Sequence, residues 1–456
     1  MKLTPGEIAA ALGAEVVAEG APEPPRRAVI DSQQAGPGDL FFGLPGEKVD
    51  GGQFAPAAIE AGAWGVVIGA KVRRTLAPHG GAKVRRTPWV FAVEDPLASM
   101  HSLARAWRRA LGARVVGVTG SVGKTSVKDI ARTLLPGKVH ANPQNFNTEI
   151  GLPLTVLEAP GETDVLVLEM AMRGKGQIAE LAAIAEPEVA VITNVGPVHV
   201  ELLGSVEAIA AAKAEILDGL PSTGTAVAPV EAGVLEPHLE RAPKLLRFGP
   251  GGDIAATEVK VDDGVTEALV ETPLGSQRFH FPFTEAHNLT NALAAIAAGV
   301  ALGADLAGMA DRAADIGFSR FRGERLELPG GIVLVNDCYN ANPVSMRAAL
   351  DHLASLGAER SVAVLGEMGE LGADSPAYHR EVGEHARAAG VDYVVGVGAP
   401  SREYDPDELV ADPGEAAELL AAQLQPGDAV LIKGSRSAGL EAVAEQLPDL
   451  MEGGDG

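Results

Sequence analysis

Three things are scarce in this sequence: cysteine, positive charge and long hydrophobic runs. Cys338 is the single cysteine among 456 residues, so the chain can form no internal disulfide and suits a reducing compartment. Lys and Arg number 37 against 61 Asp and Glu, which gives a formal net charge of −24. This acidity excludes an extended basic surface for nucleic acid, because phosphate contacts need clustered Lys and Arg. It leaves anionic substrates open, since glycine loops and helix N-termini can bind them.

The hydrophobic runs are too short for a targeting or membrane segment. The N-terminal sequence MKLTPGEIAAALG lacks the apolar core of a signal peptide. The most apolar stretch, residues 289–304, is rich in Ala and Gly and shorter than the roughly 20 residues that cross a bilayer. We therefore expect a cytoplasmic protein with no membrane insertion.

The composition that remains indicates a globular chain of several domains. Hydrophobic residues make up 46% and charged residues 21%, and the length allows two to four domains. Shifts in composition divide the chain into three blocks, which we interpret as domains at 1–95, 96–317 and 318–456. In the first block, AGAWGVVIGA predicts a helix end followed by a buried strand. The helical pattern that begins the second block ends at Gly112.

The second and third blocks alternate buried strands with helices, which predicts parallel sheets. In the second block we expect strands at 114–119, 164–170, 188–195 and 223–229, and helices at 124–135 and 176–185. Short antiparallel strands are expected within 253–283, followed by a helix from about 286 to 303. In the third block, strands at 330–337, 360–366, 392–398 and 428–434 predict a Rossmann-like domain, with helices after Pro343, Ser375 and Pro413.

The sharpest chemical signal is the segment GVTGSVGKTSVKD at 117–129, which joins a predicted strand to a predicted helix. A glycine-rich turn at a helix N-terminus directs backbone N–H groups at phosphates, a Lys reaches the terminal phosphates, and a Thr hydroxyl can bind Mg²⁺. The spacing is shorter than the usual P-loop and leaves kinases, GTPases, motors and ligases open. The residues expected to bind ATP here are Gly120, Ser121, Gly123, Lys124 and Thr125.

Polar residues follow two other predicted strands of this block. Glu169 ends one strand and His199 lies just beyond the next. Because the carboxyl ends of parallel strands share one sheet edge, both could join Thr125 around Mg²⁺. By residue type alone, 142–153 reads as a turn-rich loop, and Lys213 reads as an exposed Lys of an Ala-rich helix.

Together these segments resemble the Mur ligases, ATP-dependent enzymes that form the amide bonds of the peptidoglycan stem peptide. The shared patterns, in family order, are T-G-x-x-G-K-T at 119–125, N-x-N-T at 145–148, a strand-end Glu, T-N-x-x-x-x-H at 193–199, the helical Lys and H-N-x-x-N at 287–291. The resemblance implies ATP and Mg²⁺ as cofactors. It assigns catalytic roles to Lys124, Glu169, His199 and Lys213, with the last three and Thr125 serving the metal. Lys213 is expected to be carbamylated, and Asn291 to contact adenine.

The third block resembles the branch of this family that adds D-alanyl-D-alanine. NDCYNANPVSMRAAL at 336–350 matches its D-x-Y-N-A-N-P-x-S-M pattern, and LGEMGELG at 365–372 and LIKGSRSAGLE at 431–441 are similar too. The resemblance places Asp337 beside the nucleotide and Arg325 at its phosphates, although Arg320 and Arg322 are close enough to compete for that role. It also directs Tyr339, Asn340 and Asn342 toward the acceptor peptide.

The first block resembles the family's segment that binds the uridine diphosphate, usually D-S-R-x-x-x-x-G-D-L-F with a later D-G-H-x-F. Gln33 stands here in place of the Arg and Gly52 in place of the His. The resemblance therefore implies the fold of this domain and leaves Ser32 as its predicted substrate contact.

The sequence thus predicts an α/β protein of three domains. These are a small uridine-nucleotide-binding domain, a central P-loop ATPase domain with a parallel sheet, and a C-terminal Rossmann-like domain. The predicted reaction joins D-alanyl-D-alanine to UDP-N-acetylmuramoyl-tripeptide through an acyl phosphate, in a monomer that contacts no nucleic acid. Two alternatives are another ligase of the same fold, of the Mur or folylpolyglutamate type, and a P-loop assembly ATPase that is not a ligase.

Overall fold

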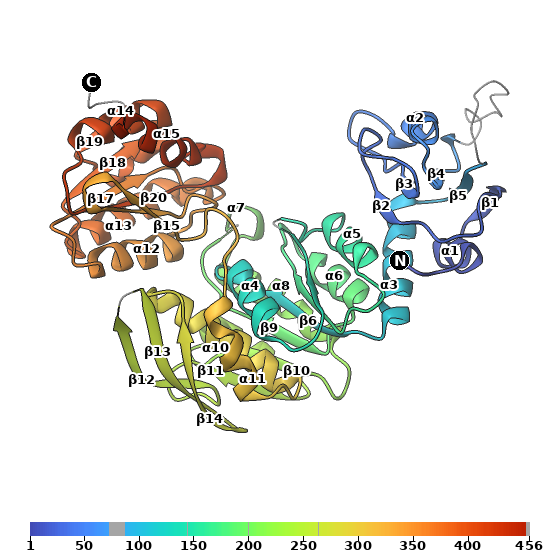
Figure 1. Cartoon of the computed structure of the whole chain (residues 1–456), viewed down its shortest axis with the longest axis horizontal. Coiled ribbons are helices and arrows are strands. Elements are labelled where there is room, and N and C mark those ends of the chain that lie inside the picture. Colours follow the sequence, from blue (N-terminus) through green and yellow to red (C-terminus); the bar gives the residue numbers. More distant parts are fainter. Residues whose placement is uncertain (73–86, 144, 199, 263, 453–456) are drawn as a thin grey trace.

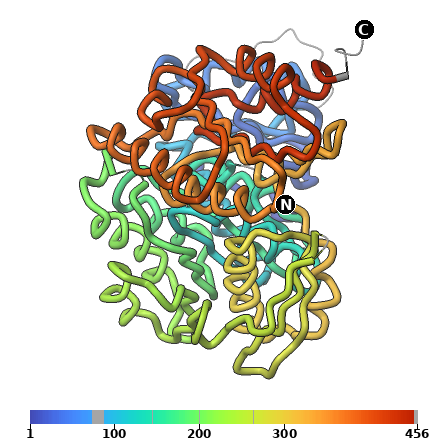
Figure 2. The backbone as a smooth tube through the Cα atoms, turned by 90° about the vertical axis from the view of Figure 1, so that its left-hand side faces the viewer, coloured from blue at the N-terminus to red at the C-terminus, as the bar shows by residue number. Residues whose placement is uncertain are grey.

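The computed structural model describes residues 1–72, 87–143, 145–198, 200–262 and 264–452. Figure 1 shows the first sheet and the last sheet at opposite sides of a central body, with a small antiparallel sheet below. In the quarter-turn view of Figure 2, the C-terminal body lies over the central one. The expected α/β class with parallel sheets is confirmed. Across the described residues, no helix is long and apolar enough to cross a membrane.

The first sheet has the strand order β1-β5-β4-β3-β2, in which β1 is antiparallel to β5 and the other pairs are parallel. Helix α1 begins with a capping box between Thr4 and Glu7, and α2 lies directly before β4 as the sequence predicts. The elements are α1 Pro5–Leu12, β1 Glu15–Ala18, β2 Arg27–Val29, β3 Asp39–Phe42, α2 Ala55–Glu60, β4 Gly65–Gly69 and β5 Trp89–Val93.

Helix α3, Pro96–Leu111, connects the first sheet to the central body (Figure 1). The Asp95 carboxylate caps its N-terminus, and Gly112 ends it in the left-handed region at φ 65°, as the sequence predicts. Trp107 of this helix belongs to one hydrophobic cluster with Leu40 of the first sheet and Leu154 of the central body. The two bodies therefore share a continuous apolar interface.

The central sheet has the order β11-β10-β9-β6-β8-β7, and all its pairs are parallel. The strands expected at 114–119, 164–170, 188–195 and 223–229 are all present, and β7 and β11 extend the sheet at its two edges. Because β6 lies between β8 and β9, the residues after these three strands meet at one edge. The strands are β6 Arg114–Thr119, β7 Val139–Ala141, β8 Val165–Glu169, β9 Val189–Ile192, β10 Thr225–Pro229 and β11 Leu245–Phe248.

Helices cover both faces of this sheet, and a three-stranded antiparallel sheet follows it. Helix α10 packs along α4, and Ile130 and Ala294 share a core with Phe279 of the small sheet. The helices are α4 Lys124–Leu134, α5 Gly151–Glu158, α6 Gln177–Ala185, α7 Val200–Leu203, α8 Val206–Ala214, α9 Glu236–Leu239, α10 Ala286–Ala301 and α11 Leu306–Arg312. The small sheet consists of β12 Ala255–Asp262, β13 Val265–Thr272 and β14 Gly275–Phe281, as expected for 253–283.

The last sheet has the order β15-β16-β20-β17-β18-β19 and is parallel except for β15, which runs antiparallel to β16. Its four buried strands are those that the sequence predicts, whereas the edge strands β15 and β19 carry too few apolar residues to be recognised. The strands are β15 Glu324–Leu328, β16 Ile332–Asn336, β17 Arg360–Leu365, β18 Tyr393–Val397, β19 Glu408–Val410 and β20 Asp428–Lys433. The helices are α12 Pro343–Ser355, α13 Ser375–Ala388, α14 Pro413–Gln423 and α15 Glu441–Glu452.

Candidate active site

The glycine loop lies between β6 and α4, where two glycines adopt conformations that other residues rarely tolerate. Gly120 has φ 151° and Gly123 has φ 80°. A Cβ atom at Gly120 would collide with the side chain of Thr193, and one at Gly123 would collide with the side-chain amide of Asn291. Glycine is therefore required at both positions, and the tight fit places Asn291 directly against the loop.

The segment after β9 fixes the conformation of this loop. The Asn194 side-chain oxygen accepts a hydrogen bond from the Val122 backbone N–H at 2.9 Å, and the Asn194 carbonyl accepts one from the Ser121 N–H. The Ser121 hydroxyl in turn contacts the backbone of Gly196. The loop is thus preorganised by residues of the T-N pattern.

Lys124 folds back over the loop instead of extending into solvent. Its Nζ donates to the carbonyl oxygen of Gly120 at 2.9 Å and to that of Ser121 at 3.3 Å. Burial lowers the pKa of Lys124, the charge of Arg322 lowers it further, and Glu169 partly opposes the shift. The side chain is half-buried, so Lys124 does not stand free in solvent.

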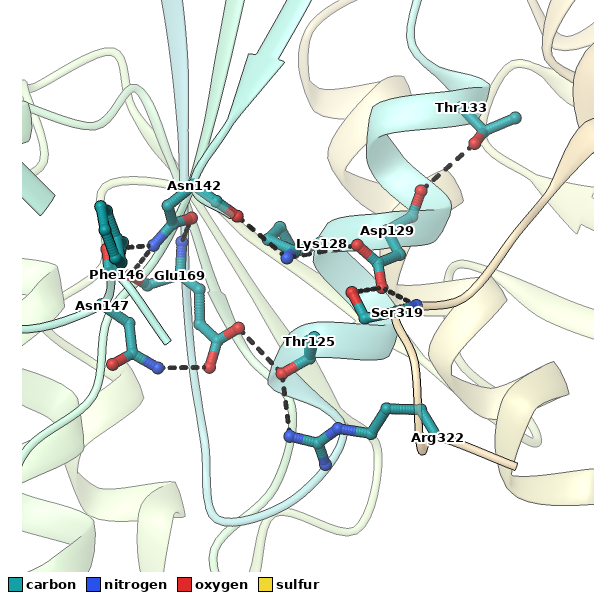
Figure 3. Close-up of polar contacts among 10 residues, drawn as sticks. All are labelled: Thr125, Lys128, Asp129, Thr133, Asn142, Phe146, Asn147, Glu169, Ser319 and Arg322. Atoms are coloured by element: carbon teal, nitrogen blue, oxygen red, sulfur yellow. Dashed lines mark hydrogen bonds and ion pairs between the residues drawn. The ribbon is translucent and has the colours of Figure 1, made fainter. Parts of the chain in front are cut away.

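Glu169 is buried at the end of β8 and is held on both carboxylate oxygens (Figure 3). The Thr125 hydroxyl donates to Oε2 at 2.9 Å, and the Asn147 amide donates to Oε1 at 2.8 Å. Asn142 exchanges two hydrogen bonds with the Glu169 backbone, at 2.8 and 2.9 Å. The segment at 142–153 therefore does more than turn the chain, because two of its Asn side chains position the carboxylate.

Lys213 is buried, so the expectation of an exposed helical Lys, made from residue type alone, is wrong. Its side chain projects from α8 and donates from Nζ to the Gly120 carbonyl at 2.8 Å. Burial and the neighbouring charge of Lys124 lower the pKa of Lys213 well below the usual lysine value. Two amines thus share one carbonyl oxygen of the glycine loop, which brings Lys213 to the place where a ligand's phosphates are expected.

Two other residues predicted for this region have different outcomes. His199 lies outside the described residues, so its assignment to the metal stays a prediction. Asn291 lies on the first turns of α10 and donates to the Asn288 side chain at 3.3 Å. Within the part of the chain that the structure describes, no three His, Cys, Asp or Glu side chains gather as a metal site. A metal here would need oxygen atoms from its ligand in addition to those of Thr125 and Glu169.

The segment that leads into the last domain contacts the helix after the glycine loop at two points (Figure 3). Ser319 donates from its backbone and its hydroxyl to the buried carboxylate of Asp129, at 2.9 and 2.7 Å. Lys128 lies 3.2 Å from the other oxygen of Asp129. Arg322 then donates to the Thr125 hydroxyl at 3.2 Å. Sequence analysis missed Asp129 and Lys128, because buried charged pairs leave no pattern in a single sequence.

The arginine at the loop is Arg322, whereas the sequence favoured Arg325 for the phosphates. Arg325 is exposed on β15, where it is paired with Val335 of β16. Arg320 is also exposed, and its guanidinium lies 4.8 Å from the centre of the Phe321 ring. In this conformation the structure brings only Arg322, of these three, to the glycine loop.

The segment after β16 is held mainly by one buried lysine. Lys433 forms an ion pair with Asp337 and donates to the Asn340 carbonyl at 3.1 Å. Tyr339 is half-buried beneath the Arg322 guanidinium, 4.1 Å from it, and burial raises the pKa of its phenol. The Asn340 side chain is exposed. Lys433 therefore joins Asp337 to Asn340, and Tyr339 lies against Arg322.

Asn342 has a structural role that its predicted contact with the acceptor did not include. It is the N-cap of α12, and its side-chain oxygen accepts from the N–H groups of Val344 and Ser345 at 3.1 and 3.0 Å. Pro343 at the first helical position completes this start. A contact with the acceptor stays a prediction and would have to use the Asn342 amide nitrogen.

Comparison with known proteins identifies the family. Models of three domains match the chain, described as the Mur ligase family catalytic domain at 28–104, the Mur ligase middle domain at 118–299 and the Mur ligase glutamate ligase domain at 321–436. A relative from Synechocystis sp. named UDP-N-acetylmuramoyl-tripeptide--D-alanyl-D-alanine ligase is 37% identical over 436 residues, covering 91% of this chain and 90% of its own. The chain belongs to the Mur ligase family.

Solved structures of Mur ligases have the same fold. MurF from Acinetobacter baumannii matches with a TM-score of 0.88 and 27% identity, over 98% of this chain and 99% of that one. The MurF ligase from Thermotoga maritima, solved in complex with ADP, matches with a TM-score of 0.81 and 30% identity, over 94% and 98% of the two chains. The predicted three-domain α/β architecture is therefore confirmed for this Mur ligase, while the domain boundaries at 95 and 317 stay predictions.

In the first domain of this Mur ligase, Ser32 lies in a turn shortly after β2. The Asp31 carboxylate accepts from the Gln33 N–H at 2.9 Å, and Ser32 itself is half-buried. Gly52 lies in the short helical turn Gly51–Phe54, and its N–H donates to the capping side chain of Asp50 at 2.9 Å. The turn is ordered by its own side chains, and the role of Ser32 toward a uridine nucleotide stays a prediction.

Proposed function

We propose that this Mur ligase joins D-alanyl-D-alanine to the terminal carboxylate of UDP-N-acetylmuramoyl-tripeptide, with ATP as the source of energy, in the cytoplasmic synthesis of peptidoglycan precursors. The relatives at 34–37% identity carry the name of this activity. The single observation that carries the proposal is the meeting of two parts of the chain. Arg322 joins Thr125, at the start of the helix after the glycine loop, to Tyr339 of the segment D-x-Y-N-A-N-P.

The chemistry needs two steps, because a carboxylate is a poor acyl donor. A carboxylate oxygen of the tripeptide attacks the γ-phosphorus of ATP, an O–P bond forms, and the bond to ADP breaks. The amine of D-alanyl-D-alanine then attacks the acyl carbon, an amide forms, and inorganic phosphate leaves. The acyl phosphate hydrolyses easily, so we expect the last domain to close over the site and exclude water.

The carboxylate and the γ-phosphate repel each other, and the lysines at the glycine loop oppose that repulsion. Lys124 would turn its Nζ from the carbonyls of Gly120 and Ser121 to the phosphate oxygens, a short movement about its own side chain. Arg325 is assigned to the phosphates by the family pattern. Asn291, packed against Gly123, would contact the adenine.

The donor set beside the loop fits Mg²⁺, which prefers oxygen ligands and commonly takes one or two carboxylates together with phosphates. Thr125 and Glu169 would hold the ion, since their oxygens lie 2.9 Å apart and Asn147 fixes the carboxylate. His199 and a carbamylated Lys213 complete the proposed metal residues. Bound there, Mg²⁺ would neutralise charge on the phosphates.

The three domains divide the substrates among them. We assign the uridine nucleotide to the domain at 1–95, with Ser32 as a contact, and ATP to the domain at 96–317. We assign the acceptor peptide to the domain at 318–456, with Tyr339, Asn340 and Asn342 as its contacts. Asp337 of the same domain is assigned to a position beside the nucleotide. We expect the protein to act as a monomer.

The test is the release of ADP from purified protein with ATP, UDP-N-acetylmuramoyl-tripeptide and D-alanyl-D-alanine, with each substrate omitted in turn. We expect rapid ADP release only when the complete mixture is present, together with a product whose mass is that of the joined peptides. A single amino acid or a folate that replaced D-alanyl-D-alanine equally well would favour another ligase of this fold. ADP release without any peptide would favour an assembly ATPase.

A further inference from the structure

One guanidinium group connects the glycine loop to the last domain. Arg322 donates from Nη2 to the Thr125 hydroxyl at 3.2 Å, and its guanidinium carbon lies 4.1 Å from the centre of the Tyr339 ring. Thr125 lies in the first turn of α4, whereas Tyr339 follows β16 of the last sheet. Figure 3 shows Arg322 reaching Thr125 from the side opposite Glu169.

The Thr125 hydroxyl is engaged on both sides in this arrangement. It donates its proton to Glu169 Oε2 at 2.9 Å and accepts a hydrogen bond from Arg322. The same oxygen is the proposed ligand of Mg²⁺. A guanidinium beside a metal ligand repels the metal, and the repulsion is little screened because Thr125 and Glu169 are both buried. Arg322 and Mg²⁺ are therefore competitors at this oxygen.

Arg322 is held at Thr125 by few contacts. Its Nε is buried, and among the described residues it has no hydrogen-bond acceptor. A buried donor without an acceptor is unfavourable. Moving the guanidinium to a place with acceptors for both Nε and Nη2 would therefore lower the free energy.

We propose that Arg322 is a positioning residue that competes with Mg²⁺ for the Thr125 hydroxyl and so couples metal binding at the nucleotide to the last domain. The inference rests on the proposed function, because it takes the magnesium complex of ATP as the nucleotide. Mg²⁺ binding releases Arg322 from Thr125, and Tyr339, which stacks on Arg322, is released with it. The coupling is reciprocal, so a change at Tyr339 alters the affinity for the metal.

The experiment measures how strongly Mg²⁺ improves ADP binding. The Kd of ADP is determined by calorimetry with saturating Mg²⁺ and with a chelator. The Kd with the chelator divided by the Kd with Mg²⁺ measures how much the metal strengthens ADP binding. The variant Arg322→Met removes the competing charge, so its ratio should rise roughly fivefold or more over that of the unmodified protein. Arg320→Met, the same change at an exposed neighbour, is the matched control and should leave the ratio unchanged.

Each outcome decides between roles for Arg322. An unchanged or smaller ratio in Arg322→Met overturns the proposal. Arg322 would give that result if it only bound the phosphates, because both Kd values would then weaken alike. Tyr339→Leu keeps the arginine but removes its stacking partner, so it should shift the ratio in the same direction by a smaller factor. If Tyr339→Leu leaves the ratio unchanged, the proposed link to the last domain is overturned. If the unmodified protein binds ADP under neither condition, the proposed function itself fails.

Discussion

Replacement of Lys124 by Met tests the phosphate chemistry most sharply, because the side chain has two separable roles. In the structure it donates to the carbonyls of Gly120 and Ser121, and in the reaction it is expected to face the transferring phosphoryl group. Methionine keeps the length of the side chain and removes the charge. Lys260→Met, on the exposed face of β12, is the matched control.

The loss of the structural role and the loss of the catalytic role have different expected free-energy costs. Gly120 keeps the hydrogen bond from Lys213 when Lys124 is lost, so only the carbonyl of Ser121, at the longer contact, loses its amine donor. One net hydrogen bond is worth about 1 kcal/mol, which corresponds to a fall in Tm of about 2–4 °C for a domain of this size. A unit-charge pair about 4 Å apart is worth about 4 kcal/mol at an effective dielectric of 20, or roughly a thousandfold in rate.

The assay compares kcat for substrate-dependent ADP release with the midpoint of thermal unfolding for both variants. We expect Lys124→Met to lose activity by roughly a thousandfold while unfolding close to the unmodified protein, and Lys260→Met to change neither quantity. A Lys124→Met variant that keeps more than about a tenth of the turnover would refute the reasoning, since it would show less than about 1.4 kcal/mol of transition-state stabilisation.

Further predictions concern the other residues of the site. Lys213→Ala should abolish ligation, and millimolar acetate should restore part of it if a carbamate normally supplies the anionic oxygen. Because the folded protein lowers the pKa of Lys213, the unfolded chain binds more protons than the folded one at pH values below the usual lysine pKa of 10.5. The free energy of unfolding of the unmodified protein therefore increases as pH rises toward 10.5. For Lys213→Met we expect a smaller increase over the same pH range. Asn291→Ala should weaken ATP binding far more than uridine-nucleotide binding, in paired calorimetric titrations. Asn340→Ala should raise the KM for D-alanyl-D-alanine without a change in Tm, whereas Asn342→Ala should also lower stability by about 1 kcal/mol through the lost helix cap.

These predictions can fail separately. A Lys213→Ala variant that runs at the unmodified rate and ignores acetate would make this Lys a purely structural group. Lower thermal stability with unchanged ATP affinity would make Asn291 a packing residue of α10. An equal rise in KM for both peptide substrates would mean that the changes at 340 and 342 disturb domain closure and do not act on the acceptor.

The strand–loop–helix unit at the nucleotide could be predicted because its signals are local. A β-branched run, two glycines and a Lys-Thr pair lie within a dozen residues, and the structure places them as β6, the loop and α4. The start of α12 could also have been read, since Asn342, Pro343 and Ser345 form a helix N-terminus by residue type alone.

The choice among the arginines could not be made from the sequence, because it depends on tertiary structure. The resemblance favours Arg325, with Arg320 and Arg322 close enough to compete. The edge strand β15 and the Ser319–Asp129 contact accompany the arrangement in which Arg322 reaches Thr125. The burial of Lys213 was hidden for a similar reason. Only the fold brings α8 against a carbonyl oxygen that lies 93 residues earlier in the chain.

The central claim is that the peptide carboxylate is activated as an acyl phosphate, and isotope transfer tests it directly. UDP-N-acetylmuramoyl-tripeptide with ¹⁸O at both oxygens of its terminal carboxylate is converted with ATP and D-alanyl-D-alanine, and the released phosphate is analysed by mass spectrometry. The account predicts one ¹⁸O atom in each phosphate, because the carboxylate oxygen that attacked phosphorus leaves with it. Phosphate without ¹⁸O, released together with the joined product, would contradict the account.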